Sequence, residues 1–143
     1  MTNLTLVHAQ TIATAALTHA RSGNLRPLAV VVLDAGGHPI AFAREDGASP
    51  YRHDIARAKA MGAIGMGDDS RAITESANAR PVFFQSVAAV VGGAIAFSPG
   101  GVLIRDHAGA IVGAVGISGD TGDMDEACAL AGIAAAGFSG SPA

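Results

Sequence analysis

One segment, residues 98–133, constrains the fold of this chain more than any other. It contains two apolar runs of strand length, at 101–105 and 110–117, separated by the turn Asp106-His-Ala-Gly109. Two such runs joined by a short turn that contains glycine predict an antiparallel β-hairpin. After the second strand the chain turns at glycine and passes into an acidic helix start, so a helix follows directly.

The rest of the chain divides into elements at clear start and stop signals. Thr5 is a good helix N-cap and Gly23 a stop, while Ser49-Pro50 predicts a hydroxyl cap followed by proline at the first helical position. We expect helices at 6–22, from 50 to about 65–67, briefly within 68–80, at 81–90 and at 121–136, and strands at 27–33, 39–45, 94–97, 101–105 and 110–117.

This order of elements predicts the α/β (α+β) class. An antiparallel five-stranded sheet with helices packed on its faces connects them with short loops. The sequence contains no repeat and no linker, so residues 1–143 are expected to form one domain.

Small side chains dominate the expected core. Half of the residues are hydrophobic, yet the chain has 19 glycines, no tryptophan and one tyrosine. Such a core buries less apolar area per residue than leucine or phenylalanine would provide. We therefore expect part of the stability to come from a face buried between subunits, in a homo-oligomer.

Charge and hydropathy exclude several classes of partner. The net charge is −3 and no Lys/Arg cluster is present, which argues against nucleic acid. No apolar run is long enough to span a membrane, and the first residues lack the pattern of a secretory signal, so we expect a cytoplasmic protein. Cys128 is the single cysteine, and we expect it to be a small packing residue of the last helix.

Two groups of residues at element ends predict a small-molecule pocket. Arg44 and Asp46 follow a strand and precede a helix, where charged groups can hold an anionic or carbonyl ligand; the alternative is a solvated loop. Glycines let backbone N–H groups line a pocket, or serve as ordinary turns. The glycine-rich candidates are Pro99, Gly100 and Gly101, together with 118–120, and Phe83 or Phe84 would supply an apolar wall.

The start of the last helix is acidic. Asp123 and Glu126 are three residues apart and share a helix face, where they could hold iron or magnesium. The alternative is that they complement the helix dipole and cap free N–H groups. Lys59 lies among small residues, so its partly buried stem would pair with a carboxylate such as Asp46 or Glu126.

Two histidines lie at the margin of the apolar face of the first helix. His8 and His19 are eleven residues and about 16 Å apart, so they cannot ligate one metal within a subunit. Either one alone could be an axial haem ligand, or simply a structural half-buried histidine.

Four motifs in order resemble the GlcG/HbpS-like family over nearly the whole chain. They are Arg44-Glu-Asp-Gly-Ala48, Asp54-Ile-Ala-Arg-Ala-Lys-Ala60, the hairpin made of 99–106 and 113–120, and Asp125-Glu126 at the start of the last helix. The resemblance implies a profilin-like fold, homo-oligomers and, in some members, haem or iron binding through a histidine of the first helix, here His19 or His8. Other members accompany catabolic enzymes or form a domain fused to a cobalamin adenosyltransferase.

Two functions are therefore expected. The first is a cytoplasmic, oligomeric small-ligand-binding protein, with haem or iron as the candidate ligand. The alternative is a small lyase, isomerase or hydrolase acting on a carboxylated or carbonyl catabolic intermediate. In that case Arg44 would anchor the carboxylate, and Asp46 or Asp120 would be the general base.

Overall fold

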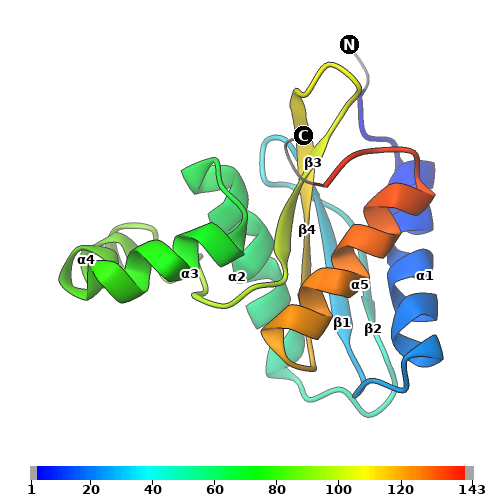
Figure 1. Ribbon diagram of the computed structural model, residues 1–143, viewed down its shortest axis with the longest axis horizontal. Helices are drawn as coiled ribbons and strands as arrows, with labels where there is room; N and C mark the ends of the chain where they lie inside the picture. Colours follow the sequence, from blue (N-terminus) through cyan, green and yellow to red (C-terminus); the bar gives the residue numbers. More distant parts are fainter. Residues whose placement is uncertain (1–2, 141–143) are drawn as a thin grey trace.

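The computed structural model of the protein describes residues 3–140 and has an α+β fold (Figure 1). In this part of the chain one four-stranded sheet has the order β2-β1-β4-β3, and all neighbouring strands are antiparallel. The strands are β1 (Ala29–Asp34), β2 (Pro39–Arg44), β3 (Gly101–Arg105) and β4 (Ile111–Ser118), and the helices are α1 (Leu6–Ser22), α2 (Tyr51–Met66), α3 (Ser70–Ala79), α4 (Pro81–Val90) and α5 (Gly122–Ala135).

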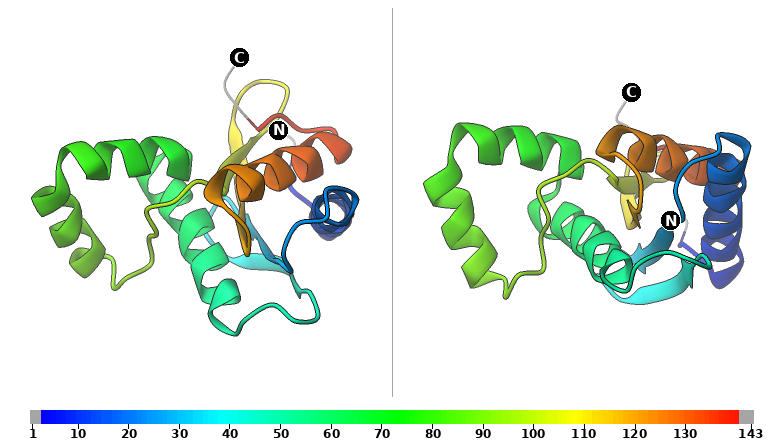
Figure 2. Two further views of the ribbon diagram at one scale, coloured as in Figure 1. Left: turned by 60° about the horizontal axis from the view of Figure 1, so that its bottom comes forward. Right: turned by 90° about the horizontal axis from the view of Figure 1, so that it is seen from below.

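Helices cover both faces of the sheet, as predicted. Val30 and Val32 of β1 face the core under α1 and α5, whereas Val31 and Leu33 face the core under α2. The views in Figures 1 and 2 show α1 and α5 side by side on one face and α2 on the other. Burial on both faces explains why the central strands read as continuous apolar runs rather than as alternating patterns.

Two glycines of the sheet let α2 pack directly on the strand backbone. A Cβ atom on Gly116 would overlap the carbonyl oxygen of Ala56, and one on Gly101 would overlap that of Lys59. The small residues of the hairpin are therefore required by packing between layers, which the glycine-rich sequence alone did not distinguish from turn chemistry.

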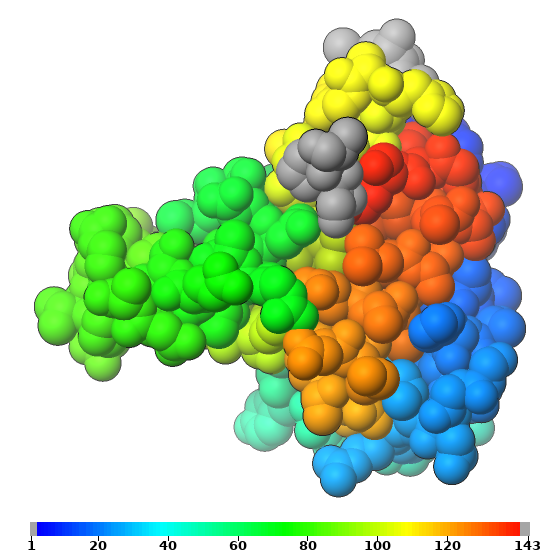
Figure 3. Space-filling model, viewed as in Figure 1, coloured from blue at the N-terminus to red at the C-terminus, as the bar shows by residue number. Residues whose placement is uncertain are grey.

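Helices α3 and α4 form an arm. Residues 70–95, here called the arm, project from the sheet and its covering helices (Figures 1 and 3). The arm has its own small core, in which Phe84 packs with Ile73, Ala77 and Ile95.

The expected fifth strand at 94–97 is wrong. This segment is irregular and follows Gly92 and Gly93, which both have positive φ. The outer edge of β3 is covered by side chains instead. The N–H of Leu103 donates to Asp69 Oδ1 at 2.8 Å, and the N–H of Gly101 donates to Ser70 Oγ at 2.8 Å.

The helix starts follow the sequence signals in one case and depart from them in another. Thr5 caps α1 in a reciprocal capping box with His8. The predicted hydroxyl cap of the second helix is wrong, because α2 begins at Tyr51 with Pro50 as its N-cap and no side-chain cap. Within residues 3–140 no helix is both long enough and apolar enough to cross a membrane.

Candidate functional site

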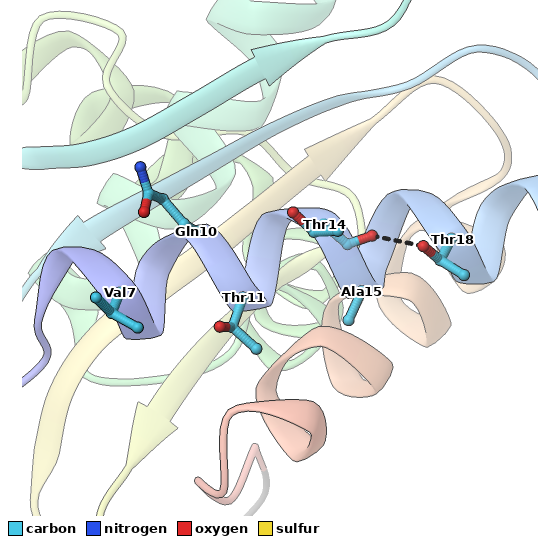
Figure 4. Close-up of a pocket in the computed structure, with 6 residues that line it drawn as sticks. All are labelled: Val7, Gln10, Thr11, Thr14, Ala15 and Thr18. Carbon is cyan, nitrogen blue, oxygen red and sulfur yellow. Dashed lines mark hydrogen bonds between the residues drawn. The ribbon is translucent and has the colours of Figure 1, made fainter.

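An uncharged hollow runs along the outer face of α1. Its first part, of about 520 Å³, is lined by the six residues drawn in Figure 4, with Gln10 on one side of the helix and Thr11 and Ala15 on the other. A second part of about 540 Å³ shares Thr14 and Thr18 with it and reaches Arg21. Both parts are wide open to solvent and are lined by α1 alone; together they are here called the α1 groove, which is uncharged until Arg21.

The two histidines of α1 have different surroundings. The N–H of Thr5 donates to His8 Nδ1 at 3.1 Å, and the His8 ring meets the Phe138 ring edge-on at 4.9 Å. His8 is thus built into the helix cap and retains only Nε2 for a ligand. His19 is exposed, one turn beyond Ala15 of the groove, and within the described residues its ring has no hydrogen bond, ion pair or ring contact.

A second hollow lies where the sequence predicted a ligand loop. It measures about 420 Å³, and it is lined by Arg21, Pro27, Arg44, Glu45 and Asp46, so it meets the α1 groove at Arg21. Glu45 has a structural role. Its Oε2 pairs with Arg21 Nε at 2.9 Å, and its Oε1 accepts the backbone N–H of Leu28, just before β1. Arg44 donates to the carbonyl of Ala48 at 2.6 Å.

Asp46 and Asp120 differ in how they are held. Asp46 is exposed at the second hollow. Asp120 accepts backbone N–H groups of Arg26 and Thr121 at 2.9 and 2.8 Å, and these bonds lower its pKa below the usual carboxyl value. A carboxylate stabilised in its charged form is a weaker proton acceptor, which disfavours Asp120 as a general base.

The glycine-rich turn approaches the protein itself and not an open pocket. Gly100 is buried, and a Cβ there would lie 2.9 Å from Lys59 Nζ. A Cβ on Gly122 would lie 2.7 Å from Pro99 Cδ, which packs this turn against the start of α5. The close backbone approach at Gly100 and Gly101 serves packing between layers, and a ligand-lining role for Pro99, Gly100 and Gly101 stays a prediction.

The expected apolar wall lies elsewhere. Phe84 meets the ring of Phe83 within the arm and the ring of Phe97 just after it, both edge-on, at 5.2 and 5.9 Å between ring centroids. Figures 1 and 2 place α4 at one end of the molecule and α1 at the other. The structure therefore does not bring Phe83 or Phe84 to the hollow at Arg44.

The acidic pair at the start of α5 binds an arginine of the arm. Arg71 Nε donates to both carboxylate oxygens of Glu126 at 3.0 and 3.1 Å, and its Nη2 pairs with Asp123. Asp123 and Glu126 share a face, as predicted, but that face holds a cation of the chain itself. Within residues 3–140, no group of three or more His, Cys, Asp or Glu side chains is placed to hold a metal.

Sequence reasoning missed the partner of Lys59. Lys59 is 2% exposed, and its Nζ donates to the Ile117 carbonyl at 2.9 Å and to Asp125 Oδ2 at 3.1 Å. The partner is thus Asp125 rather than Asp46 or Glu126. Burial lowers the pKa of Lys59, and the neighbouring Asp125 charge opposes that shift. The signal available in the sequence was spacing: Asp125 lies three and four residues before Cys128 and Ala129, so it shares their buried face of α5.

The single cysteine packs as predicted. Cys128 is fully buried on the inner face of α5, and burial raises the pKa of its thiol to about 11. Thiolate chemistry therefore has no role at this position.

A family model described as "Haem degrading protein HbpS-like" matches residues 4–134. Similar solved structures include a double mutant of Streptomyces reticuli HbpS (30% identity, TM-score 0.79, 94% of this chain and 87% of that one). Klebsiella pneumoniae ORFY has 25% identity, a TM-score of 0.85 and coverage of 96% and 93%. A PduOC–haem complex has 22% identity, a TM-score of 0.88 and coverage of 99% and 100%. No curated protein matches the sequence significantly.

Proposed function

The chain belongs to the family of haem-degrading, HbpS-like proteins, and from that premise we propose that it binds haem against α1, with His19, which lies beside the α1 groove, as axial ligand. The observation that carries this proposal is the exposed imidazole of His19, unengaged within the described residues and one turn from the groove. An imidazole nitrogen is a common axial ligand of haem iron.

The groove suits the two chemical parts of haem. It is open to solvent and uncharged, so a flat apolar ring can lie against it. Arg21 lines both the groove and the second hollow, and Arg44 lines the second hollow; guanidinium groups bind carboxylates such as propionates well. Bound haem would supply a redox-active iron, while the chain supplies the imidazole and the cations.

The relatives support the ligand class. The PduOC structure is a haem complex, and its backbone resembles this chain over the full length of both. At 22% identity that likeness supports only a fold compatible with haem, so the choice of His19 rests on this chain's own geometry.

A haemin titration of the metal-free protein, followed by visible absorption, tests the proposal. We expect a saturable Soret shift in the wild type and in His8→Ala, but not in His19→Ala. His107→Ala, in the turn between β3 and β4, is the matched control for loss of an exposed histidine. A shift that survives in His19→Ala, with the fold verified by circular dichroism, would overturn this ligand assignment.

The proposal includes a cytoplasmic homo-oligomer. Its support is the core of small side chains, in which alanines of α1 and α2 are fully buried but contribute little area each. Iron at Asp123 and Glu126 is not part of the proposal, because Arg71 engages both carboxylates.

A second candidate function rests on the hollow at Arg44. Arg44 and Asp46 line the same space, so one could anchor a carboxylate while the other removes a proton from a carbonyl compound. Small carboxylated carbonyl compounds can be screened for turnover by NMR. Turnover that disappears in Asp46→Asn while the fold survives would favour this function, and an unchanged rate would exclude Asp46 as the base.

A further inference from the structure

Two opposite charges line the second hollow without neutralising each other. Arg44 donates one hydrogen bond, from Nη1 to the Ala48 carbonyl, and its Nε and Nη2 have no partner within residues 3–140. The carboxylate of Asp46 accepts no hydrogen bond in this part of the chain. The two side chains also form no ion pair with each other among the described residues, although both line the same space.

The other two charges of the hollow cancel. Glu45 Oε2 lies 2.9 Å from Arg21 Nε, and Glu45 Oε1 accepts a hydrogen bond from Arg21 Nη2 at 3.2 Å. The same Oε1 accepts the N–H of Leu28 at 2.8 Å, so the Glu45 carboxylate is held by the protein on both oxygens. The hollow therefore offers a small molecule one available cation, Arg44, and one available anion, Asp46.

We propose that this hollow binds a free α-amino acid, with the ligand carboxylate on Arg44 and the ligand ammonium group on Asp46. The planar fork of a guanidinium group matches the two oxygens of a carboxylate, and an ammonium group donates hydrogen bonds to a carboxylate. An α-amino acid carries both charges on one carbon atom, so one small molecule can meet both side chains. Pro27, the apolar member of the lining, favours a small aliphatic side chain on the ligand.

The charge balance of the hollow disfavours ligands that carry a single charge. A carboxylate alone would pair with Arg44 but leave Asp46 facing a like charge, and an amine alone would do the reverse at Arg44. The inference goes beyond the two functions proposed above, because it requires neither haem nor a reaction. Since the hollow is open to solvent and exposed ion pairs contribute little, we expect a dissociation constant of about one millimolar.

Four ligands built on one branched alkyl group test the two charges separately. L-Valine has both charged groups, isovalerate has only the carboxylate, and isobutylamine has only the ammonium group, while 3-methyl-2-oxobutanoate replaces the ammonium group of valine with a carbonyl. Amide NMR of the isotope-labelled full chain measures each dissociation constant and verifies the fold of each variant. The variants are Arg44→Gln and Asp46→Asn. Arg57→Gln and Asp54→Asn, at exposed charges of α2, are the matched controls.

We expect valine to bind at least about threefold more tightly than each of the other three ligands. Arg44→Gln should remove the advantage of valine over isobutylamine, and Asp46→Asn its advantage over isovalerate, while the two control variants should retain both. A merely structural role of either residue would not change affinity in this charge-selective way.

An oxo acid that binds as tightly as valine would overturn the amino-acid assignment and favour the second candidate function. Valine affinity that is unchanged in both Arg44→Gln and Asp46→Asn would overturn the site, as would the absence of a saturable shift with valine. Haemin affinity is a separate readout, so the proposed haem site stands or falls independently of these outcomes.

Discussion

Lys59 Nζ and Asp125 Oδ2 lie 3.1 Å apart in a fully buried ion pair that joins α2 to α5, two helices on opposite faces of the sheet. The same ammonium group binds the Ile117 carbonyl near the end of β4, and Asp125 Oδ1 accepts the N–H of Asp120. The glycine at position 100 leaves room for the ammonium group. The pair thus ties both helical layers to the end of one central strand.

Lys59→Met is expected to destabilise the protein strongly. Loss of the ammonium leaves the Asp125 carboxylate buried without a counterion, which typically costs about 3–5 kcal/mol. The double variant Lys59→Met/Asp125→Leu removes both charges and should recover a large part of that loss. Urea unfolding measures both values. A cost below about 1 kcal/mol for Lys59→Met would contradict a buried charge at Asp125.

Replacing glycine by alanine should have opposite effects on stability at two positions. Gly116 is contacted by α2, and Gly65 lies within it. In Gly116→Ala the new methyl group overlaps the Ala56 carbonyl, and such overpacking typically costs about 1–3 kcal/mol. In Gly65→Ala the methyl group meets open space inside a helix, which should stabilise by about 0.5–1 kcal/mol. Thermal unfolding of the two variants side by side checks the pair; equal shifts would exclude close packing as the role of Gly116.

Local signals predicted most elements of the fold. The hairpin that ends at Ser118, the Thr5 cap and the helix that begins at Pro81 all depend on residues close together in the sequence. The error at 94–97 had a long-range cause. The edge of β3 is covered by Asp69 and Ser70, more than 30 residues earlier in the chain, and no local pattern reveals such a side-chain cover.

The hollow at Arg44 could be predicted because it is local, and its use as a ligand site stays a prediction. Arg44 and Asp46 are neighbours in sequence, so their common hollow follows from a loop of a few residues. The positions of Phe84 and of the partner of Lys59 depend instead on how the arm and α5 pack, which propensity and spacing do not determine. His8 and His19 lie on the same side of a helical wheel, and the capping box with Thr5 and the packing of Phe138 on His8 separate them.

Stability should respond to the ionisation of Asp69. Burial raises the pKa of this carboxyl above 3.8, and its bond from the Leu103 N–H opposes the shift. Because the folded pKa is raised, the carboxyl stabilises the fold fully below pH 3.8 and loses that contribution as pH rises through the folded pKa. Asp69→Asn keeps the acceptor oxygen without the charge, so it should be more stable than wild type at pH 7.

The advantage of Asp69→Asn should shrink as pH falls toward 3.8, where the wild-type carboxyl is itself protonated. Urea unfolding at a series of pH values measures the difference. Glu75→Gln, an exposed carboxyl on α3, is the control. A stability difference for Asp69→Asn that is constant with pH would exclude ionisation as its cause.

Arg44 should contribute to haem affinity only through the propionates. An exposed ion pair is worth little, so Arg44→Gln is expected to weaken haemin binding by about two- to fivefold. Haemin dimethyl ester, which has no carboxylates, should bind wild type and variant equally. Arg57→Gln on the exposed side of α2 is the matched control. An equal loss for the ester would mean that Arg44 acts on the fold and not on the ligand.

The arm is held to the sheet body by a short clasp, residues 69–71, in which Arg71 binds Glu126 and Asp123 of α5. These ion pairs raise the already high pKa of Arg71 further, so the clasp stays charged at any physiological pH.

In Arg71→Met the arm loses its link to α5, while β1 and β4 keep their own cores. We therefore expect faster hydrogen exchange of amides in α3 and α4 and unchanged exchange in the central strands, since local opening follows local contacts. Arg57→Met, which removes an exposed arginine of α2, should change neither. Faster exchange throughout the sheet in Arg71→Met would show that Arg71 supports the whole fold and not the arm alone.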